Sequence, residues 1–361
     1  MSAGPLRIML VDDSVVIRRL LADTLQGDPE IVVCGTAGDG QAALEKLEGF
    51  QPDAIVLDIE MPRLDGIGTL KELRKKRPRL PVVMFSTLTE RGAAATLDAL
   101  AAGANDYVTK PSNTGSYELA RARVRETLVP KLKALCGRGA SVAAQGSSPA
   151  GIAKPSAPRV GPPARVDIVA IGVSTGGPSA LEAVLPRLRA DFPAPIVLVQ
   201  HMPPLFTKLL ADRLASKSRI KVVEAQDGQP LARGVCHIAP GDWHMSLKSD
   251  GALVRIALDQ APHENSCRPA VDPLLRSVAR IYGPNSLSVI LTGMGQDGLK
   301  GCEATRKAGG WVYAQDEATS VVWGMPGFVA RSGLADKVLP LDQVAGEIEA
   351  RVMARRAAIA G

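Results

Sequence analysis

The stretch LRIMLVDD at residues 6–13 is a short apolar run that ends in two aspartates. A second run, AIVLD at residues 54–58, repeats this pattern, and such runs alternate with helical patterns as far as residue 136. The predicted strands are 7–11, 31–35, 54–57, 81–85 and 107–109, and the predicted helices are 14–25, 40–48, 67–77, 91–102 and 117–136, the last broken or kinked at Pro130. Five β/α units of this kind predict an α/β domain with a doubly wound parallel sheet.

Polar side chains follow four of these five strands, at the edge of the sheet where a doubly wound fold binds its ligand. They are Asp12 and Asp13 after the first strand, Asp58 after the third, Ser86 and Thr87 after the fourth, and Lys110 after the fifth. Any one of them could be a solvated loop residue, but their joint placement favours a site. Clustered carboxylates suit Mg²⁺, and the lysine and hydroxyls can contact phosphoryl oxygens.

Length and composition indicate two domains. The chain has 361 residues, which is more than a single hydrophobic core usually supports. Residues 137–164 include 21 Ala, Gly, Pro or Ser residues in 28, a composition typical of a linker. We therefore expect a first domain at residues 1–136, a linker at 137–164 and a second domain at 165–361.

The distribution of charge argues against nucleic acid as a partner. The formal charge of +6 divides into −2 for residues 1–130, +5 for residues 131–164 and +3 for the remainder. A nucleic-acid-binding domain concentrates positive charge on a folded face, usually with aromatic side chains, and this chain has only 12 aromatic residues.

The sequence also predicts a cytoplasmic protein without direct membrane insertion. No run of 18 apolar residues occurs, and the apolar run at 8–11 ends at Asp12, so neither a spanning helix nor a secretory signal is expected. The five cysteines are odd in number and lack C-x-x-C spacing, which argues against a disulfide framework or a zinc site.

The second domain repeats the pattern of strands that lead into polar residues. An apolar run at 166–173 precedes the turn STGGP, a run at 195–200 precedes His201, and a run at 287–292 precedes the loop GMGQDG, which contains Asp297. A strand, a tight turn and a helical pattern at 179–189 indicate a Rossmann-like α/β domain with a second doubly wound parallel sheet.

Residues 172–176 fit G-x-S-x-G, in which glycines permit a sharp turn that exposes Ser174 at the head of a helix. The helix N-terminus offers N–H groups to an oxyanion, although such a turn could equally bind phosphate or only pack closely. A nucleotide site would need an acid about 20 residues further on. Asp191 lies near that distance, but its loop between Pro186 and Pro193 does not resemble the fingerprint. A transcription factor would need a compact basic helix-turn-helix, which this glycine-rich region does not offer.

Several residues compete for the base and its partner. The histidines are His201, His237, His244 and His263. His201 alone follows a predicted strand, whereas His237 lies inside an apolar stretch and the other two lie in loops. Asp297 could be an ordinary turn residue or could orient the imidazole. Asp242 and Asp272 are alternative orienting carboxylates.

Residues 5–130 resemble the receiver domain of two-component response regulators. The resemblance is carried by VDDS at 11–14, VLDIEMP at 56–62, FST at 85–87 and YVTKP at 107–111. It implies a flavodoxin-like domain that is phosphorylated with Mg²⁺ by a histidine kinase. The implied residues are Asp58 as phospho-acceptor, Asp12 and Asp13 with Asp58 as metal ligands, Lys110 as phosphate partner, and Ser86 and Tyr107 as switch residues.

Residues 166–350 resemble the catalytic domain of the chemotaxis protein-glutamate methylesterases. The shared motifs are IGVSTGGP at 171–178, QHMPP at 200–204, IAPGDWHM at 238–245, SCRPAVD at 266–272, LTGMGQDG at 291–298 and AQDEATSVVWGMP at 314–326. The resemblance implies a phosphorylation-activated hydrolase that needs no cofactor for the hydrolytic step. It also implies that methyl-accepting chemotaxis receptors are the substrate and that specific glutamines are deamidated.

The same resemblance assigns site residues. It implies a catalytic triad of Ser174, His201 and Asp297, with Met294 and Thr175 in the wall of the oxyanion site. Arg268 is a candidate substrate contact. The family often has RPSVD where this chain has RPAVD at 268–272, so one hydroxyl is missing beside that contact.

Overall fold

The computed structural model describes residues 4–111, 116–137, 165–251 and 253–354. The chain divides into two compact units, Met1–Gly146 and Ser147–Gly361. The predicted linker at 137–164 lies outside the described residues apart from Gly137. No helix in the described part of the chain is long and apolar enough to cross a bilayer.

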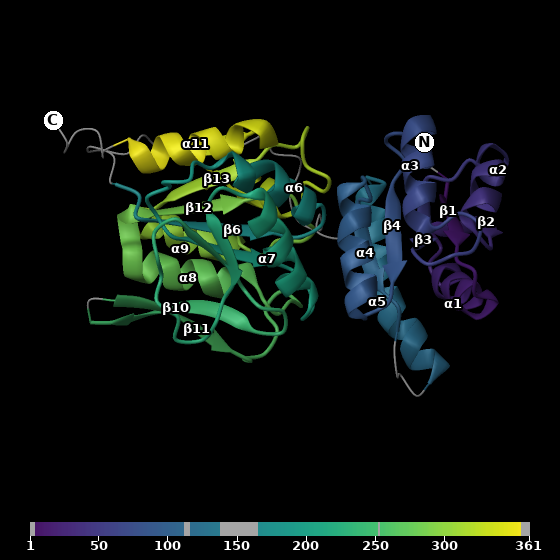
Figure 1. The fold of residues 1–361 in the computed structure, drawn as a ribbon, viewed down its shortest axis with the longest axis horizontal. Helices are drawn as coiled ribbons and strands as arrows, with labels where there is room; N and C mark the ends of the chain where they lie inside the picture. The colour runs from purple at the N-terminus through teal and green to yellow at the C-terminus, as the bar shows by residue number, and fades with distance from the viewer. Residues whose placement is uncertain (1–3, 112–115, 138–164, 252, 355–361) are drawn as a thin grey trace. The chain divides into compact units, whose positions relative to one another are not determined.

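The first unit is a five-stranded parallel sheet in the order β2-β1-β3-β4-β5. Its strands are β1 (Leu6–Val11), β2 (Ile31–Ala37), β3 (Ala54–Asp58), β4 (Val82–Ser86) and β5 (Asp106–Thr109). Its helices are α1 (Val15–Gln26), α2 (Gly40–Phe50), α3 (Gly66–Lys76), α4 (Glu90–Ala101) and α5 (Tyr117–Leu135). Helices α1 and α5 pack together over one face of the sheet, and α2, α3 and α4 cover the other (Figure 1). The predicted doubly wound fold is confirmed.

Side-chain caps fix where four of these helices begin. Ser14, Asp39, Asp65 and Thr89 each accept a hydrogen bond from the backbone N–H three residues further on. Helix α5, in contrast, continues through Pro130, so of the predicted break or kink at this residue the break is wrong. Leu128, Val129 and Leu132 of this helix are buried against the sheet, and this packing offsets the missing N–H of the proline.

The second unit contains a seven-stranded sheet in which every pair is parallel, in the order β14-β13-β12-β6-β7-β9-β8. The strands are β6 (Ile168–Val173), β7 (Ile196–Gln200), β8 (Lys221–Glu224), β9 (Val235–Ile238), β12 (Ser286–Ile290), β13 (Trp311–Gln315) and β14 (Lys337–Leu339). A separate antiparallel hairpin joins β10 (His244–Asp250) to β11 (Leu253–Asp259).

Helices cover both faces of this sheet, as the sequence predicts for a doubly wound domain (Figure 1). One group consists of α6 (Gly177–Val184), α7 (Phe206–Lys217) and α11 (Leu341–Met353). The other consists of α8 (Val271–Tyr282), α9 (Leu299–Lys307) and α10 (Met325–Arg331), with the hairpin packed on α8. Short 3₁₀ turns at Leu185–Arg187 and Gly283–Asn285 follow α6 and α8.

The order of the strands places the candidate residues together. Strand β6 lies between β12 and β7. Strands β7, β9 and β8 extend the sheet on one side of β6, and β12, β13 and β14 extend it on the other. At such a switch point the loops after adjacent strands diverge and leave room for a ligand. The loops after β6, β7 and β12 carry Ser174, His201 and Asp297, so the three residues share one edge of the sheet.

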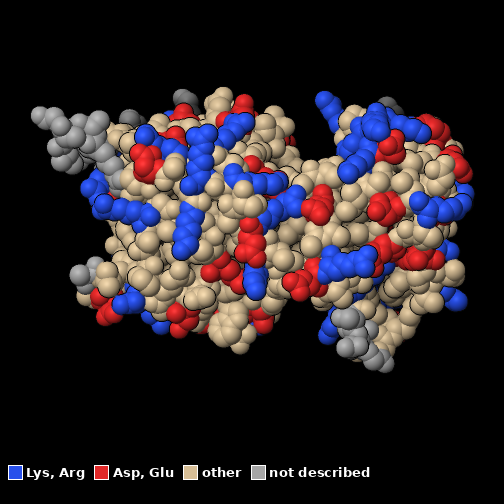
Figure 2. Space-filling model, in the orientation of Figure 1, with Lys and Arg blue, Asp and Glu red and all other residues tan. Residues whose placement is uncertain are grey.

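The surface is of mixed charge. Figure 2 shows acidic and basic side chains interspersed on the visible face of each unit. Some charged side chains of the second unit form ion pairs, such as Arg213 with Glu182 and Arg276 with Glu264.

Candidate functional site

The turn that carries Ser174 is fixed by its backbone. Gly177 N–H donates to the Ser174 carbonyl at 2.8 Å and closes the turn, while Gly176 has φ 77°, which glycine adopts without strain. Ser174 N–H donates to Thr292 O at 3.0 Å, and the buried Gln200 side chain donates to Ser174 O at 3.0 Å. The serine side chain is therefore presented, half-buried, from a rigid turn at the head of α6.

The loop after β12 packs directly against this serine. A methyl group placed on Gly293 would lie 2.9 Å from Ser174 Cβ and 2.4 Å from Met325 Sδ, so only glycine fits there. Among the described residues, no acceptor contacts the N–H of the next residue, Met294. The buried Thr175 holds the two loops together, because its carbonyl accepts from the Thr292 hydroxyl at 2.9 Å. A backbone donor is thus available beside the serine for developing negative charge.

His201 lies next to Ser174 because the strands that precede them are paired. Val173 is in register with Gln200, and His201 N–H donates to Val173 O at 3.3 Å. Nε2 of the ring lies 2.8 Å from Asp297 Oδ2, and Nδ1 lies 3.5 Å from Cys267 Sγ. No hydrogen bond joins the Ser174 hydroxyl to the ring in the described part of the chain, a common state of ligand-free sites.

The histidine and the aspartate form a buried hydrogen-bonded pair. The His201 side chain is 11% exposed and that of Asp297 is 2% exposed. Burial lowers the pKa of His201, but the hydrogen bonds with Asp297 and Cys267 outweigh it and raise the pKa to about 10. Burial likewise raises the pKa of Asp297, but the hydrogen bonds from His201 and from backbone N–H groups lower it overall. Asp297 therefore stabilises the positive charge that the imidazole acquires when it takes up a proton.

Asp297 is held by more donors than the histidine alone. Its Oδ2 also accepts from Val271 N–H at 2.6 Å. Its Oδ1 accepts from Asp272 N–H at 3.0 Å, from the Asn265 amide at 2.9 Å and from Gly298 N–H at 2.9 Å. Since Ala270 provides no side-chain cap for α8, Asp297 fills that place from another loop.

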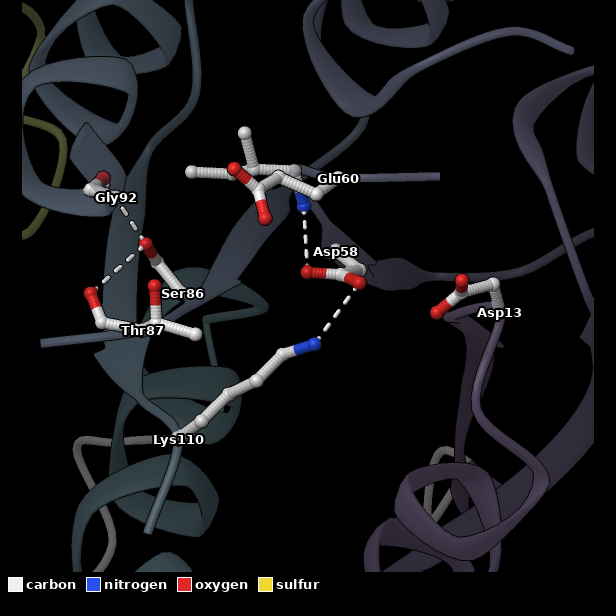
Figure 3. A pocket seen from close by; sticks show the side chains of 8 residues that line it. Asp13, Asp58, Glu60, Ser86, Thr87, Gly92 and Lys110 are labelled. Atoms are coloured by element: carbon white, nitrogen blue, oxygen red, sulfur yellow. Dashed lines mark hydrogen bonds and ion pairs between the residues drawn. The ribbon is translucent and has the colours of Figure 1, made fainter. Parts of the chain in front are cut away.

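The first unit holds a second polar cluster (Figure 3). Ligand oxygens of Asp12, Asp13 and Asp58 lie within 4.8 Å of one another, and Lys110 Nζ is 2.8 Å from Asp58 and 2.9 Å from Asp12. Burial raises the pKa of Asp58, and the hydrogen bond from Lys110 opposes that rise. Three clustered carboxylates beside a pocket of about 290 Å³ fit a hard divalent cation together with a phosphoryl group.

The two predicted switch residues differ in their positions. The Ser86 hydroxyl donates to Gly92 O at 3.1 Å and not to Asp58 (Figure 3). Ser86 nevertheless lines the same pocket as Asp58. Tyr107 is buried, at 7% exposed, with Lys131 against its ring. The tyrosine ring is therefore already inside the domain in this conformation.

Comparisons with known proteins assign a family to each of the two units. The CheB methylesterase family model matches residues 169–348, and the response regulator receiver domain model matches residues 8–120. A protein-glutamate methylesterase/protein-glutamine glutaminase from Trichodesmium erythraeum is 51% identical over 349 residues, covering 96% of this chain and 99% of the relative. The chain belongs to the CheB methylesterase family.

Two further relatives support this membership. A protein of the same name from Nocardioides sp. is 49% identical over 359 residues, covering 97% of this chain and 96% of the relative. The crystal structure of the Thermotoga maritima CheB methylesterase catalytic domain aligns with a TM-score of 0.50 at 48% identity, covering 51% of this chain and 98% of that one. The predicted combination of a receiver domain with a methylesterase domain is confirmed.

The competing candidates in the methylesterase domain have other partners or are exposed. Buried His237 is on β9, where burial and Lys221 lower its pKa to about 4. His244 is bound at both ring nitrogens, by Ala270 N–H and Pro262 O. His263 is exposed, as is Asp191, which pairs with Arg189.

The alternative carboxylates and Arg268 have other partners. Asp242 pairs with Arg268 at 2.6 Å, and Asp272 accepts from Gly301 N–H at 2.7 Å. Arg268 Nη1 donates to the carbonyls of Gln260 and Ala261 at 3.0 and 3.1 Å. The guanidinium expected to contact substrate is therefore engaged in holding its own loop.

Sequence reasoning missed two residues at this site, Asn265 and Cys267. Both belong to the turn 264–267, which contacts His201 through Cys267 and Asp297 through Asn265. The motif SCRPAVD drew attention to residues 268–272 instead. No pattern in the sequence shows that this loop folds back onto the strand ends.

Proposed function

We propose that this chain is a phosphorylation-activated hydrolase that removes methyl esters from glutamate side chains of chemoreceptors and deamidates specific glutamines. The observation that carries the proposal is the 2.8 Å contact between His201 Nε2 and Asp297 Oδ2. Ser174 and His201 directly follow the paired residues Val173 and Gln200 of adjacent strands. The names of the relatives at 51% and 49% identity supply the substrate class.

The ring orientation sets the course of the proton. Since Nε2 of His201 is bound to Asp297, Nδ1 is the nitrogen that accepts the Ser174 proton. The serine oxygen then bonds to the ester carbonyl carbon, and the carbonyl oxygen becomes an oxyanion beside Met294 N–H. Asp297 stabilises the imidazolium that has formed.

Collapse of the tetrahedral intermediate breaks the bond to the methoxy group. His201 donates its Nδ1 proton to that group, and methanol leaves. A water molecule then attacks the acyl-serine, with His201 as base, and free glutamate and Ser174 are regenerated. With a glutamine side chain the same acyl-enzyme forms with loss of ammonia.

The receiver domain supplies the proposed control. We infer that Asp58 accepts a phosphoryl group from a histidine kinase in the cytoplasm, with Asp12, Asp13 and Asp58 as ligands of Mg²⁺. The bound cation would offset the negative charge at the attacking carboxylate and the phosphoryl oxygens. Lys110, which reaches both buried aspartates, is placed to contact the phosphoryl group, and Ser86 could turn from Gly92 O toward it.

The decisive experiment is methanol release from methyl-labelled receptor membranes by the Ser174→Ala variant. We expect a loss on the order of 10⁴ or more in kcat, because the nucleophile is gone. Cys267→Ala is the matched control, since this thiol also lies within 3.5 Å of His201, and it should keep most of the activity. Near-normal turnover by Ser174→Ala, or loss only in Cys267→Ala, would refute the assignment of the nucleophile.

A further inference from the structure

The amide of Asn265 lies between two buried carboxylates. Its Nδ2 is 2.9 Å from Asp297 Oδ1 and 3.0 Å from Asp272 Oδ2. The two aspartates are 2% and 1% exposed. Because one NH₂ group donates to both, the two carboxylate oxygens lie less than about 6 Å apart.

Two carboxylates this close in a buried site repel each other unless donors separate them. Asp297 has several donors, whereas in the described part of the chain Asn265 is the sole donor to Oδ2 of Asp272. Burial raises the pKa of Asp272, and the charge of Asp297 adds to that rise. Asn265 is thus the group that separates the two negative charges.

The other groups that face Asp297 do not offset this repulsion. The titratable or charged groups that interact with its carboxylate are His201, Glu264, Asp272, Arg276 and Cys302. Glu264 and Arg276 form a two-pronged ion pair with distances of 2.6 and 2.7 Å, which adds no net charge. The buried thiol of Cys302 is neutral, since burial raises its pKa. His201 is therefore the remaining positive partner.

The backbone around Asn265 explains how the amide reaches this position. Glu264 and Cys267 exchange two backbone hydrogen bonds, at 3.1 and 3.0 Å, and close a four-residue turn. Its central residues, Asn265 and Ser266, have φ of 53° and 62°. Asparagine tolerates this left-handed region better than most residues, so it combines the required backbone with a side-chain donor.

We propose that Asn265 is a positioning residue of the esterase, whose amide orients the Asp297 carboxylate toward His201 and shields it from Asp272. This inference rests on the proposed triad. Asn265 acts through Asp297 and does not touch the reacting atoms. This role explains how the Asp272 carboxylate can lie beside the His201–Asp297 pair without becoming protonated.

The test is the pH dependence of kcat/KM for the full-length chain with methyl-labelled receptor membranes. Asn265→Gly removes the amide while retaining the left-handed backbone. Loss of the donor leaves the two carboxylates less stabilised and more basic, so the His201–Asp297 pair binds its proton more tightly. The acid limb of the profile should therefore move to higher pH by about one unit, which is roughly a tenfold loss of activity below the limb.

Three further variants make the result specific. Ser266→Gly is the matched control, because it adds the same freedom to the same turn and removes a hydroxyl that makes no hydrogen bond in the described part of the chain. Its profile should match the wild type. Asn265→Asp keeps the size of the side chain, adds a charge and should shift the limb further. Adding Asp272→Asn to Asn265→Gly removes the repelling charge and should return the limb toward its original position.

The outcomes separate this inference from the proposed function. If Ser174→Ala keeps its activity, the triad fails, whatever Asn265 does. If Ser174→Ala is inactive but Asn265→Gly has the profile of Ser266→Gly, the role of Asn265 is overturned alone. A loss of equal size at every pH, not reversed by Asp272→Asn, also overturns it, because that is the effect of a residue that only supports the fold.

Discussion

Asp297→Asn replaces one carboxylate oxygen with an NH₂ group at a point where five N–H donors converge. They come from His201, Asn265, Val271, Asp272 and Gly298. An asparagine has one acceptor oxygen, so its NH₂ group must face donors on one side or the other. The least unfavourable arrangement turns it toward His201, because an imidazole can exchange its proton between nitrogens.

That arrangement disables the base. With Nε2 of His201 accepting from the amide, the ring proton moves to Nδ1, which can then no longer take the proton of Ser174. We expect kcat to fall on the order of 10⁴, while KM changes little. The loss is measured as methanol released from labelled receptor membranes.

The same substitution should destabilise the methylesterase domain. Removing a negative charge from the N-terminus of α8 costs about 1–2 kcal/mol, and a buried N–H left without an acceptor costs about 1–3 kcal/mol. Together these predict a loss of about 2–5 kcal/mol in the free energy of unfolding, measured by urea denaturation. Asp242→Asn is the control, because its carboxylate contacts Arg268 and not His201.

Two results would refute this reasoning. Activity of Asp297→Asn within about tenfold of wild type would move the orienting role to Asp272, since a wrong tautomer costs far more than that. Unchanged stability would mean that Asp297 does not cap α8.

Three other perturbations follow from the described contacts. Asp58→Asn should abolish the response of methanol release to a phosphodonor and leave basal activity intact; a retained response would place the phospho-acceptor elsewhere. Gly241→Ala would put a methyl group 2.2 Å from Pro204 N, so we expect thermal unfolding to show a loss of about 1–3 kcal/mol, whereas Gly346→Ala, on an exposed helical position with no atom within 4 Å, should gain about 0.8–1 kcal/mol. Equal effects of the two substitutions would contradict the close packing of Gly241 against Pro204. Because the folded-state pKa of His201 is raised from 6.5 to about 10, its stabilising contribution is complete below pH 6.5 and lost as pH rises toward 10. The free energy of urea unfolding should show this decline with pH for the wild type and not for His201→Gln. Parallel pH dependences of the two proteins would exclude this contribution of His201.

Sequence alone predicted the elements that lie at the centre of each sheet. Strands β1, β3, β6, β7 and β12 are short and largely apolar, and a polar residue that directly follows such a strand is placed by it. This is why Ser174 and His201 could be singled out before their contacts were known. The peripheral hairpin β10–β11 was not foreseen, because its alternation of exposed and buried residues is irregular.

The sequence limits the carboxylate partner of His201 to a few candidates but does not decide among them. Asp242, Asp272 and Asp297 all lie in or beside loops, and the path of a loop depends on packing far along the chain. Asn265 is 32 residues from Asp297, and Cys267 is 66 residues from His201. At Pro130 the local sequence predicts a break in the helix, but burial of the neighbouring leucines outweighs that effect.

Asp297 both contacts His201 and caps α8, and this combination affects how the domain can evolve. Catalytic groups often cost a protein stability, so losing one commonly makes the fold more robust and inactive descendants persist easily. Here the carboxylate that we propose orients the histidine also caps the first turn of α8. Substitution of this aspartate would reduce both the activity and the stability of the domain. Loss of Asp297 is therefore not a mutational route to a stable but inactive domain.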